Sequence, residues 1–190
     1  MYSLFIDSHD SKVSVVLFKN GKVIVEKLEE SNNKHSTIVM PLIREVIESQ
    51  NIDIKDINEI LVVNGPGSFT GERIAVTIAK TMAYCLNIPI KVVDALTVIA
   101  INVDSDEKYV SIPDRNGAFI GIFNKDNKPI YDFSYINKNE YLELCDSHKV
   151  ISDIKIDYNL VFDYFKTILP TKAHEVKPLY IKGISALNGK

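Results

Sequence analysis

The sequence has few cysteines, no surplus of positive charge and no long apolar run, and each absence excludes a class of protein. Cys85 and Cys145 stand sixty positions apart without CxxC spacing. This arrangement suits two reduced thiols in a cytosolic protein better than a disulfide framework or a zinc site. The 22 basic and 25 acidic side chains give a formal net charge of -3. No overall cationic field attracts nucleic acid, so tight RNA binding by this chain alone is not expected.

No apolar run approaches the length that spans a bilayer, and Asp7 interrupts the apolar stretch that a signal peptide would need. We therefore expect a cytoplasmic protein with no membrane association. Hydrophobic residues make up 46% of the chain, which is enough to bury a core. The histidines His9, His35, His148 and His174 are scattered, and none forms the i, i+4 pair of a metal-binding helix. We expect no metal site, which argues against a metallopeptidase.

Residues 1–100 have the pattern of a ribonuclease H-like unit. Apolar, β-rich runs predict strands at 2–7, 13–18 and 22–28, and Asn20-Gly21 suits the tight hairpin turn before the third. A wide apolar stripe predicts a helix over 36–50. Buried strands are expected at 59–64 and 88–93, with a second helix between them. The order strand-strand-strand-helix-strand-helix-strand is the ribonuclease H-like arrangement.

Residues 101–190 repeat this layout in shortened form after an acidic connector at 102–108. The expected elements are strands at 109–112, 117–123 and 129–136, a helix at 137–146, a strand at 149–154, a helix at 158–169 and an extended segment at 177–183. Two such units in tandem are typical of the actin-like ATPase fold. We therefore predict an α/β protein of actin-like ATPase (ribonuclease H-like) fold with subdomains 1–100 and 101–190.

The motif GPGSFTG joins the fourth strand to the second helix, where backbone amides can meet an anion. It is not a phosphate-binding P-loop, because Glu72 stands where the lysine should be. Its glycines do not have the spacing of a dinucleotide-binding loop. The GxSxG pattern, which marks a nucleophilic serine on a sharp strand-to-helix turn, is absent. The residues favour a strained strand-to-helix turn in which Ser68 or Thr70 caps the helix, and leave a functional role open. The motif comprises Gly65, Pro66, Gly67, Ser68, Phe69, Thr70 and Gly71.

Small residues line one face of the helix that follows the motif. Ala75, Ala79 and Ala83 recur at intervals of four, which lets another backbone approach closely. The wide stripe of the preceding helix includes Val39 and Ile43. Either these faces dock on a helix pair of another protein, or the two helices pack on each other within the domain.

The turn after the first strand contains Asp7, Ser8 and Ser11, where actin-like ATPases place an aspartate and small hydroxyl residues facing phosphates. His9 and Asp10 are bulky for such a turn, and the second half lacks a glycine-rich adenosine site. Autonomous ATP hydrolysis is therefore not expected, although a small actin-like sugar or acid kinase remains the main alternative. His35 is expected at the surface, with Ser36 capping the first helix.

The segment NGPGSFTGERIAVTIAK, followed by IPIKVVDALTVIA, closely resembles the signature region of the bacterial TsaB (YeaZ) family. LFIDSHDSKVSVVLFKNGKVI is similar to that family's opening hairpin, and KHSTIVMPLIREVI to the start of its first helix. VKPLYIKG lies near the family's closing Pro-x-Tyr-Leu-Arg. The resemblance covers residues 1 to about 100 well and the rest loosely.

This resemblance implies a non-catalytic subunit. TsaB proteins look like degenerate relatives of the catalytic TsaD subunit, and with TsaD and the ATPase TsaE they make threonylcarbamoyladenosine on tRNA. They pair with TsaD through a four-helix bundle, and with themselves through much the same surface. The resemblance implies no cofactor bound to the chain alone, ATP or ADP at the junction with TsaD, and tRNA contact only through the complex. The expected interface is the motif with Arg73, Ala75, Ala79, Ala83, Val39 and Ile43.

The chain departs from the family pattern at three places. Asp7-Ser8-His9 stands where the family has Asp-Thr-Ser, and Glu72 stands where leucine is common. The second half is also shorter than in many relatives. The first turn is accordingly less suited to a phosphate contact, whereas the negative charge of Glu72 suits the start of a helix.

Overall fold

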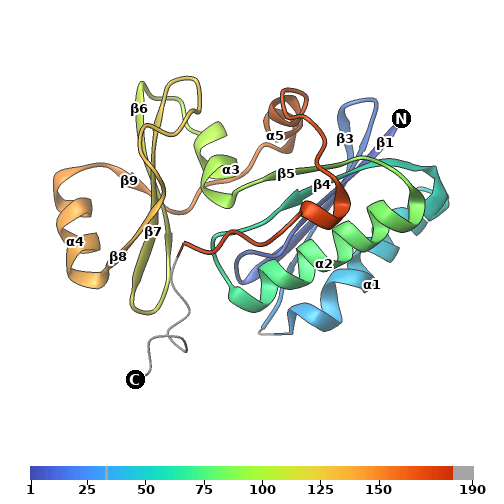
Figure 1. The fold of residues 1–190 in the computed structure, drawn as a ribbon, viewed down its shortest axis with the longest axis horizontal. Helices are drawn as coiled ribbons and strands as arrows, with labels where there is room; N and C mark the ends of the chain where they lie inside the picture. The colour runs from blue at the N-terminus through green and yellow to red at the C-terminus, as the bar shows by residue number, and fades with distance from the viewer. Residues whose placement is uncertain (33, 182–190) are drawn as a thin grey trace.

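In the computed structural model, residues 1–32 and 34–181 are described and form two β-sheets (Figure 1). The strands of the first sheet are β1 (Tyr2–Asp7), β2 (Lys12–Lys19), β3 (Lys22–Glu30), β4 (Ile57–Val63) and β5 (Ile90–Val93). Their order is β3-β2-β1-β4-β5, with an antiparallel meander of β1 to β3 and parallel pairing of β1, β4 and β5. This is the ribonuclease H-like order, and the predicted fold class is confirmed.

Hydrophobic cores lie on both faces of the first sheet, because consecutive strand residues point to opposite faces. The helices packed on it are α1 (His35–Glu48), α2 (Phe69–Leu86), α3 (Ala95–Ile101) and α5 (Tyr158–Phe165). Leu4 and Ile6 of β1 belong to the core under α1 and α2, whereas Phe5 belongs to the core with α3 and α5. β1 is buried on both faces, which explains its nearly continuous apolar sequence.

Local signals set the ends of these elements. Asn20 and Gly21 have φ of 51° and 81°, as the predicted hairpin turn requires. α2 ends at Asn87, whose left-handed φ of 53° closes the helix. The carboxylate of Asp94 accepts a hydrogen bond of 2.7 Å from the backbone N–H of Thr97 and so caps α3, a helix that the sequence did not predict.

The second sheet has the order β8-β7-β6-β9. Its elements are β6 (Glu107–Pro113), β7 (Gly117–Asn124), β8 (Ser134–Asn137), α4 (Lys138–Ser147) and β9 (Val150–Ile151), while the short 3-10 turns η1 (Ile54–Asp56) and η2 (Ala173–Glu175) belong to the loops. The predicted strand at 129–136 was too long, because continuous pairing with β7 begins at Ser134 and only an isolated bridge joins Pro129 to Phe123 before it. The predicted strand at 149–154 reduces to β9, and the helix predicted at 158–169 ends at Phe165.

After β9 the chain returns to the first sheet (Figure 1). The ring of Phe162 in α5 packs on Phe18 of β2 with centroids 4.8 Å apart, and Thr171 forms a bridge with Ile90 of β5. The extended segment expected at 177–183 is described only as far as residue 181. The subdomain boundary at residue 100 stays a prediction. Within the described ranges, no helix is both long enough and apolar enough to cross a membrane.

Candidate functional site

The motif turn, residues 65–71, packs directly against the β1–β2 turn, residues 8–11. The backbone N–H of Ser68 donates a hydrogen bond of 2.6 Å to the carbonyl oxygen of His9, and the Ser8 hydroxyl donates one of 2.7 Å to the carbonyl oxygen of Gly71. A β-carbon at Gly71 would lie 1.8 Å from the carbonyl oxygen of Ser8, and one at Gly67 would lie 2.1 Å from that of His9. The two glycines are therefore required by the close approach of two backbones.

Ser68 is the N-cap of α2, as one of the two sequence interpretations predicted. Its side-chain oxygen accepts a hydrogen bond of 3.2 Å from the backbone N–H of Gly71. Thr70 lies within the first turn of the helix and is exposed. The expectation for α1 was wrong, because its N-cap is Lys34, with no capping side chain. His35 is buried, and its Nε2 lies 2.8 Å from the carbonyl oxygen of Asp10.

Two of the three side chains proposed for a phosphate turn, those of Asp7 and Ser8, are engaged within the protein. Oδ1 of Asp7 accepts a hydrogen bond of 3.0 Å from the backbone N–H of His9 and lies 2.7 Å from His9 Nδ1. Burial tends to lower the pKa of His9, but the charge and hydrogen bond of Asp7, together with the charges of Asp10 and Glu72, outweigh it and raise that pKa above its ordinary value. Ser8 is fully buried, and Ser11 is exposed. A phosphate contact at these residues stays a prediction.

Glu72 folds back onto the motif turn from the first turn of α2. The residue is 3% exposed, and a β-carbon at Gly65 would come within 2.5 Å of its carboxyl group. Burial raises the pKa of Glu72 to about 7, although a hydrogen bond from Gly67 and the nearby charges of His9 and Arg73 act in the opposite direction. Glu72 and His9 are thus two titratable residues that both lie against the motif turn.

A cavity of about 460 Å³ lies beside the β1–β2 turn, between β2, β3, α3 and residues 152–156. Its lining includes Asp7 and His9, and further carboxylates from Asp10, Glu26 and Asp153. Lys12 and Lys155 are the lysines of this lining. With four carboxylates against two lysines, this lining supplies little positive charge for a polyphosphate.

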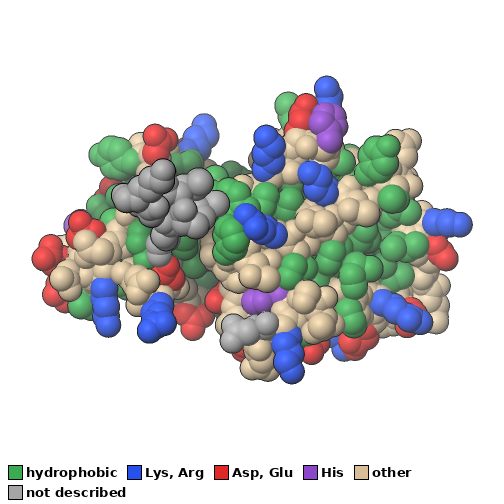
Figure 2. All heavy atoms as spheres, turned by 60° about the horizontal axis from the view of Figure 1, so that its bottom comes forward, with side chains coloured by type: hydrophobic (Ala, Val, Ile, Leu, Met, Phe, Trp, Pro, Cys, Tyr) green, Lys and Arg blue, Asp and Glu red, His purple; other side chains and the backbone are tan. Residues whose placement is uncertain are grey.

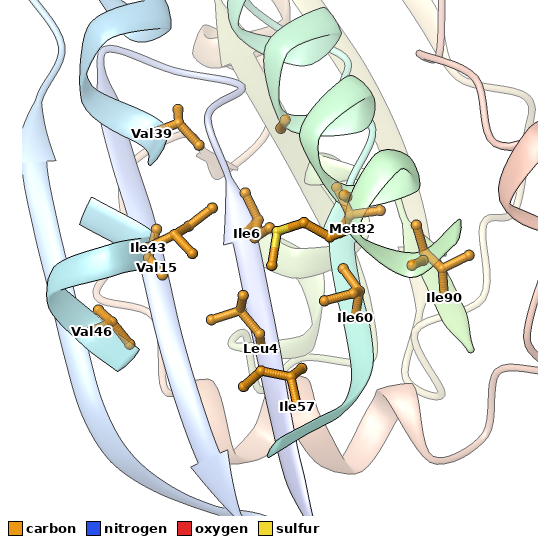
Figure 3. Close-up of a cluster of buried hydrophobic side chains, with 14 of the residues drawn as sticks. Leu4, Ile6, Val15, Val39, Ile43, Val46, Ile57, Ile60, Met82 and Ile90 are labelled. Carbon is orange, nitrogen blue, oxygen red and sulfur yellow. The ribbon is translucent and has the colours of Figure 1, made fainter. Parts of the chain in front are cut away.

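The predicted interface residues of the alanine face are buried inside the chain, and this part of the prediction was wrong. Ala75 and Ala79 are completely buried, and Ala83 is 2% exposed. Val39 and Ile43 of α1 are equally buried and point into the core over β1 and β2 (Figure 3). The small side chains let α1 and α2 lie side by side on the sheet, which is the alternative that the sequence left open.

The exposed and half-buried residues of α2 lie on its opposite side. We call this side the α2 outer face and define it by Phe69, Thr70, Arg73, Ile74, Thr77, Ile78 and Tyr84. Phe69 is 46% exposed and Tyr84 is 79% exposed. Met40 of α1 adds another exposed apolar side chain. Figure 2 shows hydrophobic side chains gathered over the half of the molecule that α1 and α2 cover.

Of the other motif residues, Gly65, Pro66 and Gly71 are buried, whereas Gly67 and Ser68 are partly exposed. The predicted interface residues that are exposed rather than half-buried are therefore Phe69, Thr70 and Arg73. The sequence signal for the outer face was the spacing of Phe69, Arg73 and Thr77 by four residues.

No sequence pattern placed the C-terminal strap, residues 176–181, in the site. Val176 is buried in the core under α2, and its carbonyl oxygen accepts a hydrogen bond of 3.1 Å from Lys80 Nζ. Asn64 pairs twice with the strap: its side-chain N–H₂ donates to the carbonyl oxygen of Lys177 at 3.1 Å, and its carbonyl oxygen accepts from the backbone N–H of Leu179 at 2.8 Å. The strap thereby brings Tyr180 onto α2.

Comparisons with known proteins agree with this architecture. Residues 27–114 match the family model for TsaD, tRNA N6-adenosine threonylcarbamoyltransferase. YeaZ from Pseudomonas aeruginosa shares the fold with a TM-score of 0.78 at 17% identity, over 94% of this chain and 100% of that one.

Two curated relatives carry the name tRNA threonylcarbamoyladenosine biosynthesis protein TsaB. The protein from Bacillus subtilis (strain 168) is 32% identical over 75% of this chain, and the match spans 58% of its own length. The protein from Buchnera aphidicola subsp. Acyrthosiphon pisum (strain APS) is 30% identical over 94% of this chain and 81% of its own length. With this coverage and the shared fold, the chain belongs to the TsaB family.

Proposed function

We propose that this chain is the non-catalytic docking subunit of the machinery that makes threonylcarbamoyladenosine on tRNA. It pairs in the cytoplasm with a TsaD-type catalytic subunit and, within the assembled complex, meets a TsaE-type ATPase. Its membership of the TsaB family and the names of its relatives support this role. The motif turn determines the backbone conformation at the start of α2. The buried hydroxyl of Ser8 donates a hydrogen bond within the protein and therefore takes no part in catalysis in this proposal.

The α2 outer face is the observation that carries the proposal. Its exposed apolar side chains lie above a core that is already closed by the buried side of the same helix. The segment that matches the TsaD model, residues 27–114, contains both α1 and α2. A TsaD-type partner can therefore present an equivalent helix pair, and the two pairs would form a four-helix bundle. A second copy of this chain offers the same α2 outer face, so homodimer formation would compete with binding of the TsaD-type partner.

Nucleotide and tRNA enter this proposal only through the complex. The carboxylate of Asp7 is engaged by His9, and the adjacent cavity is rich in carboxylates, so we propose no nucleotide site in the isolated chain. ATP or ADP would bind at the junction with the partner. The formal net charge of -3 supports indirect contact with tRNA through the assembled subunits.

Pairing with TsaD from the same organism tests the proposal. At micromolar concentration, size exclusion with light scattering should give the mass of a heterodimer. Thr77→Arg places a long charge in the middle of the outer face and should abolish this species, whereas Asn139→Arg on exposed α4 should leave it unchanged. Separate peaks for the two wild-type proteins would contradict the proposal. Calorimetric binding of ATP by the isolated chain would favour the kinase alternative instead.

A further inference from the structure

The guanidinium group of Arg73 is held in place on the α2 outer face. Its central carbon lies 3.7 Å from the centroid of the Phe69 ring and 5.5 Å from that of Tyr180. Nε donates a hydrogen bond of 2.7 Å to the Tyr180 hydroxyl. Phe69 and Tyr180 are 46% and 45% exposed, so the cluster is formed at the surface rather than in the core. The stacking and the hydrogen bond together restrict a side chain that would otherwise be flexible.

The strap fixes Tyr180 independently of Arg73. Burial of Val176 anchors one end of the strap, and the paired hydrogen bonds with Asn64 hold its middle. Tyr180 lies one residue beyond Leu179, whose backbone N–H makes one of these bonds. The orientation of Arg73 is therefore set by a segment more than a hundred residues away in sequence.

The charge of Arg73 is left without a paired carboxylate. Within residues 1–32 and 34–181 it forms no ion pair, whereas Arg44 pairs with Glu48 at 2.6 Å. The carboxylate of α2 is Glu72, which is 3% exposed and turned onto the motif turn. Nε of Arg73 donates its hydrogen bond to Tyr180. The two terminal nitrogens of the guanidinium can donate a parallel pair of hydrogen bonds, a geometry that matches a carboxylate. The outer face thus presents an oriented cation among apolar side chains.

We propose that Arg73 is the charged anchor of the docking surface and binds a carboxylate side chain of the TsaD-type partner, with the strap as part of the interface. This inference rests on the proposed pairing and names a residue that determines its affinity. Burial of the apolar rings around the guanidinium would desolvate the pair and strengthen it relative to an exposed salt bridge. A protein carboxylate fits better than an RNA phosphate, because the surrounding outer face is apolar rather than basic.

Affinities of the heterodimer, measured by calorimetry with purified TsaD, test the proposal. Arg73→Lys keeps the charge but loses the paired donors, and should raise the Kd about tenfold or more. Tyr180→Phe keeps the ring but removes the hydrogen bond that orients the guanidinium, and should raise the Kd by a smaller factor, about threefold. Arg115→Lys, at an exposed turn of the second sheet, is the matched control and should bind as wild type. Circular dichroism melting verifies that each variant is folded.

The possible results separate this inference from the proposed function. If wild-type chains pair and Arg73→Lys binds equally well, Arg73 is not the anchor, although the docking role stands. If the wild-type chain does not pair with TsaD at all, the proposed function fails and the inference with it. If Arg73→Lys pairs normally but weakens tRNA binding by the complex, the guanidinium faces RNA and the inference is wrong.

Discussion

Replacing Glu72 with glutamine should remove a pH dependence that its buried carboxyl imposes on folding. The carboxyl has a pKa of about 7 in the folded chain against an ordinary value of 4.5, chiefly because burial disfavours its charged form. Between these values the folded state retains a proton that the unfolded state has lost. The stabilisation from this proton is complete below pH 4.5 and disappears as the pH rises through about 7, so the free energy of unfolding falls over that window.

The magnitude follows from the difference between the two pKa values. Each pKa unit corresponds to about 1.4 kcal/mol, which places an upper bound of about 3 kcal/mol on the change from pH 4.5 to above 7. Screening by solvent at the partly exposed Gly67 and Ser68 reduces this, and about 2 kcal/mol is expected. Glutamine has nearly the same shape, and its side-chain oxygen can accept the hydrogen bond from Gly67 without carrying a charge. The variant should therefore gain about 2 kcal/mol relative to wild type between pH 5 and pH 8.

Urea unfolding of both proteins at a series of pH values between 5 and 8, followed by circular dichroism, measures this difference. His9 faces Glu72 and its own pKa is raised, so its stabilising proton is also lost as the pH rises. The charges of Asp7 and Asp10, which raise the pKa of His9 in both proteins, cancel in the comparison, whereas the smaller contribution that Glu72 makes to this pKa is lost in the variant. Glu143→Gln, at an exposed position of α4, is the control, and its free energy of unfolding should change with pH as that of the wild type does. If the free energy of unfolding of Glu72→Gln also changed with pH as that of the wild type does, the reasoning would be refuted.

Two substitutions separate the buried and exposed sides of α2, and a third tests the motif turn. Ala79→Arg forces a charge into a completely buried position and should cost about 3 to 5 kcal/mol or prevent folding, whereas Thr77→Arg should leave the urea midpoint almost unchanged. Equal midpoints would show that Ala79 is not in the core. Gly71→Ala places a β-carbon 1.8 Å from the carbonyl oxygen of Ser8 and should cost about 2 to 4 kcal/mol in the same assay. A cost close to zero would mean that the two turns separate easily.

The first sheet was predictable because each of its elements carries an unambiguous local pattern. β1 and β4 are uninterrupted apolar runs of strand length, and Asn20-Gly21 determines the hairpin. α3 was not predicted, because its sequence ALTVIAI is apolar around nearly the whole helix and shows no helical periodicity. Its cap, Asp94 with Thr97, was the signal that could have revealed it.

The site was predicted in part, since a helix that is apolar over much of its circumference does not reveal which side faces inward. Ala75 and Ala79 were assigned to a partner because small residues permit close approach, but both are buried in the core that α2 shares with the first sheet and α1 of the same chain. The contact of Tyr180 with Arg73 spans 107 residues and leaves no local pattern. Such long-range contacts depend on the assembled fold, and sequence periodicity does not report them.

His9 connects two regions that the fold otherwise separates. Its side chain lines the cavity of about 460 Å³ near the second sheet, and its carbonyl oxygen holds the backbone of Ser68 at the start of α2. A displacement of the β1–β2 turn on the cavity side must therefore pull on the first turn of α2, where Phe69 and Arg73 lie. The docking side chains and the cavity are thus connected through the β1–β2 turn, by the carbonyl oxygen of His9 and the hydroxyl of Ser8.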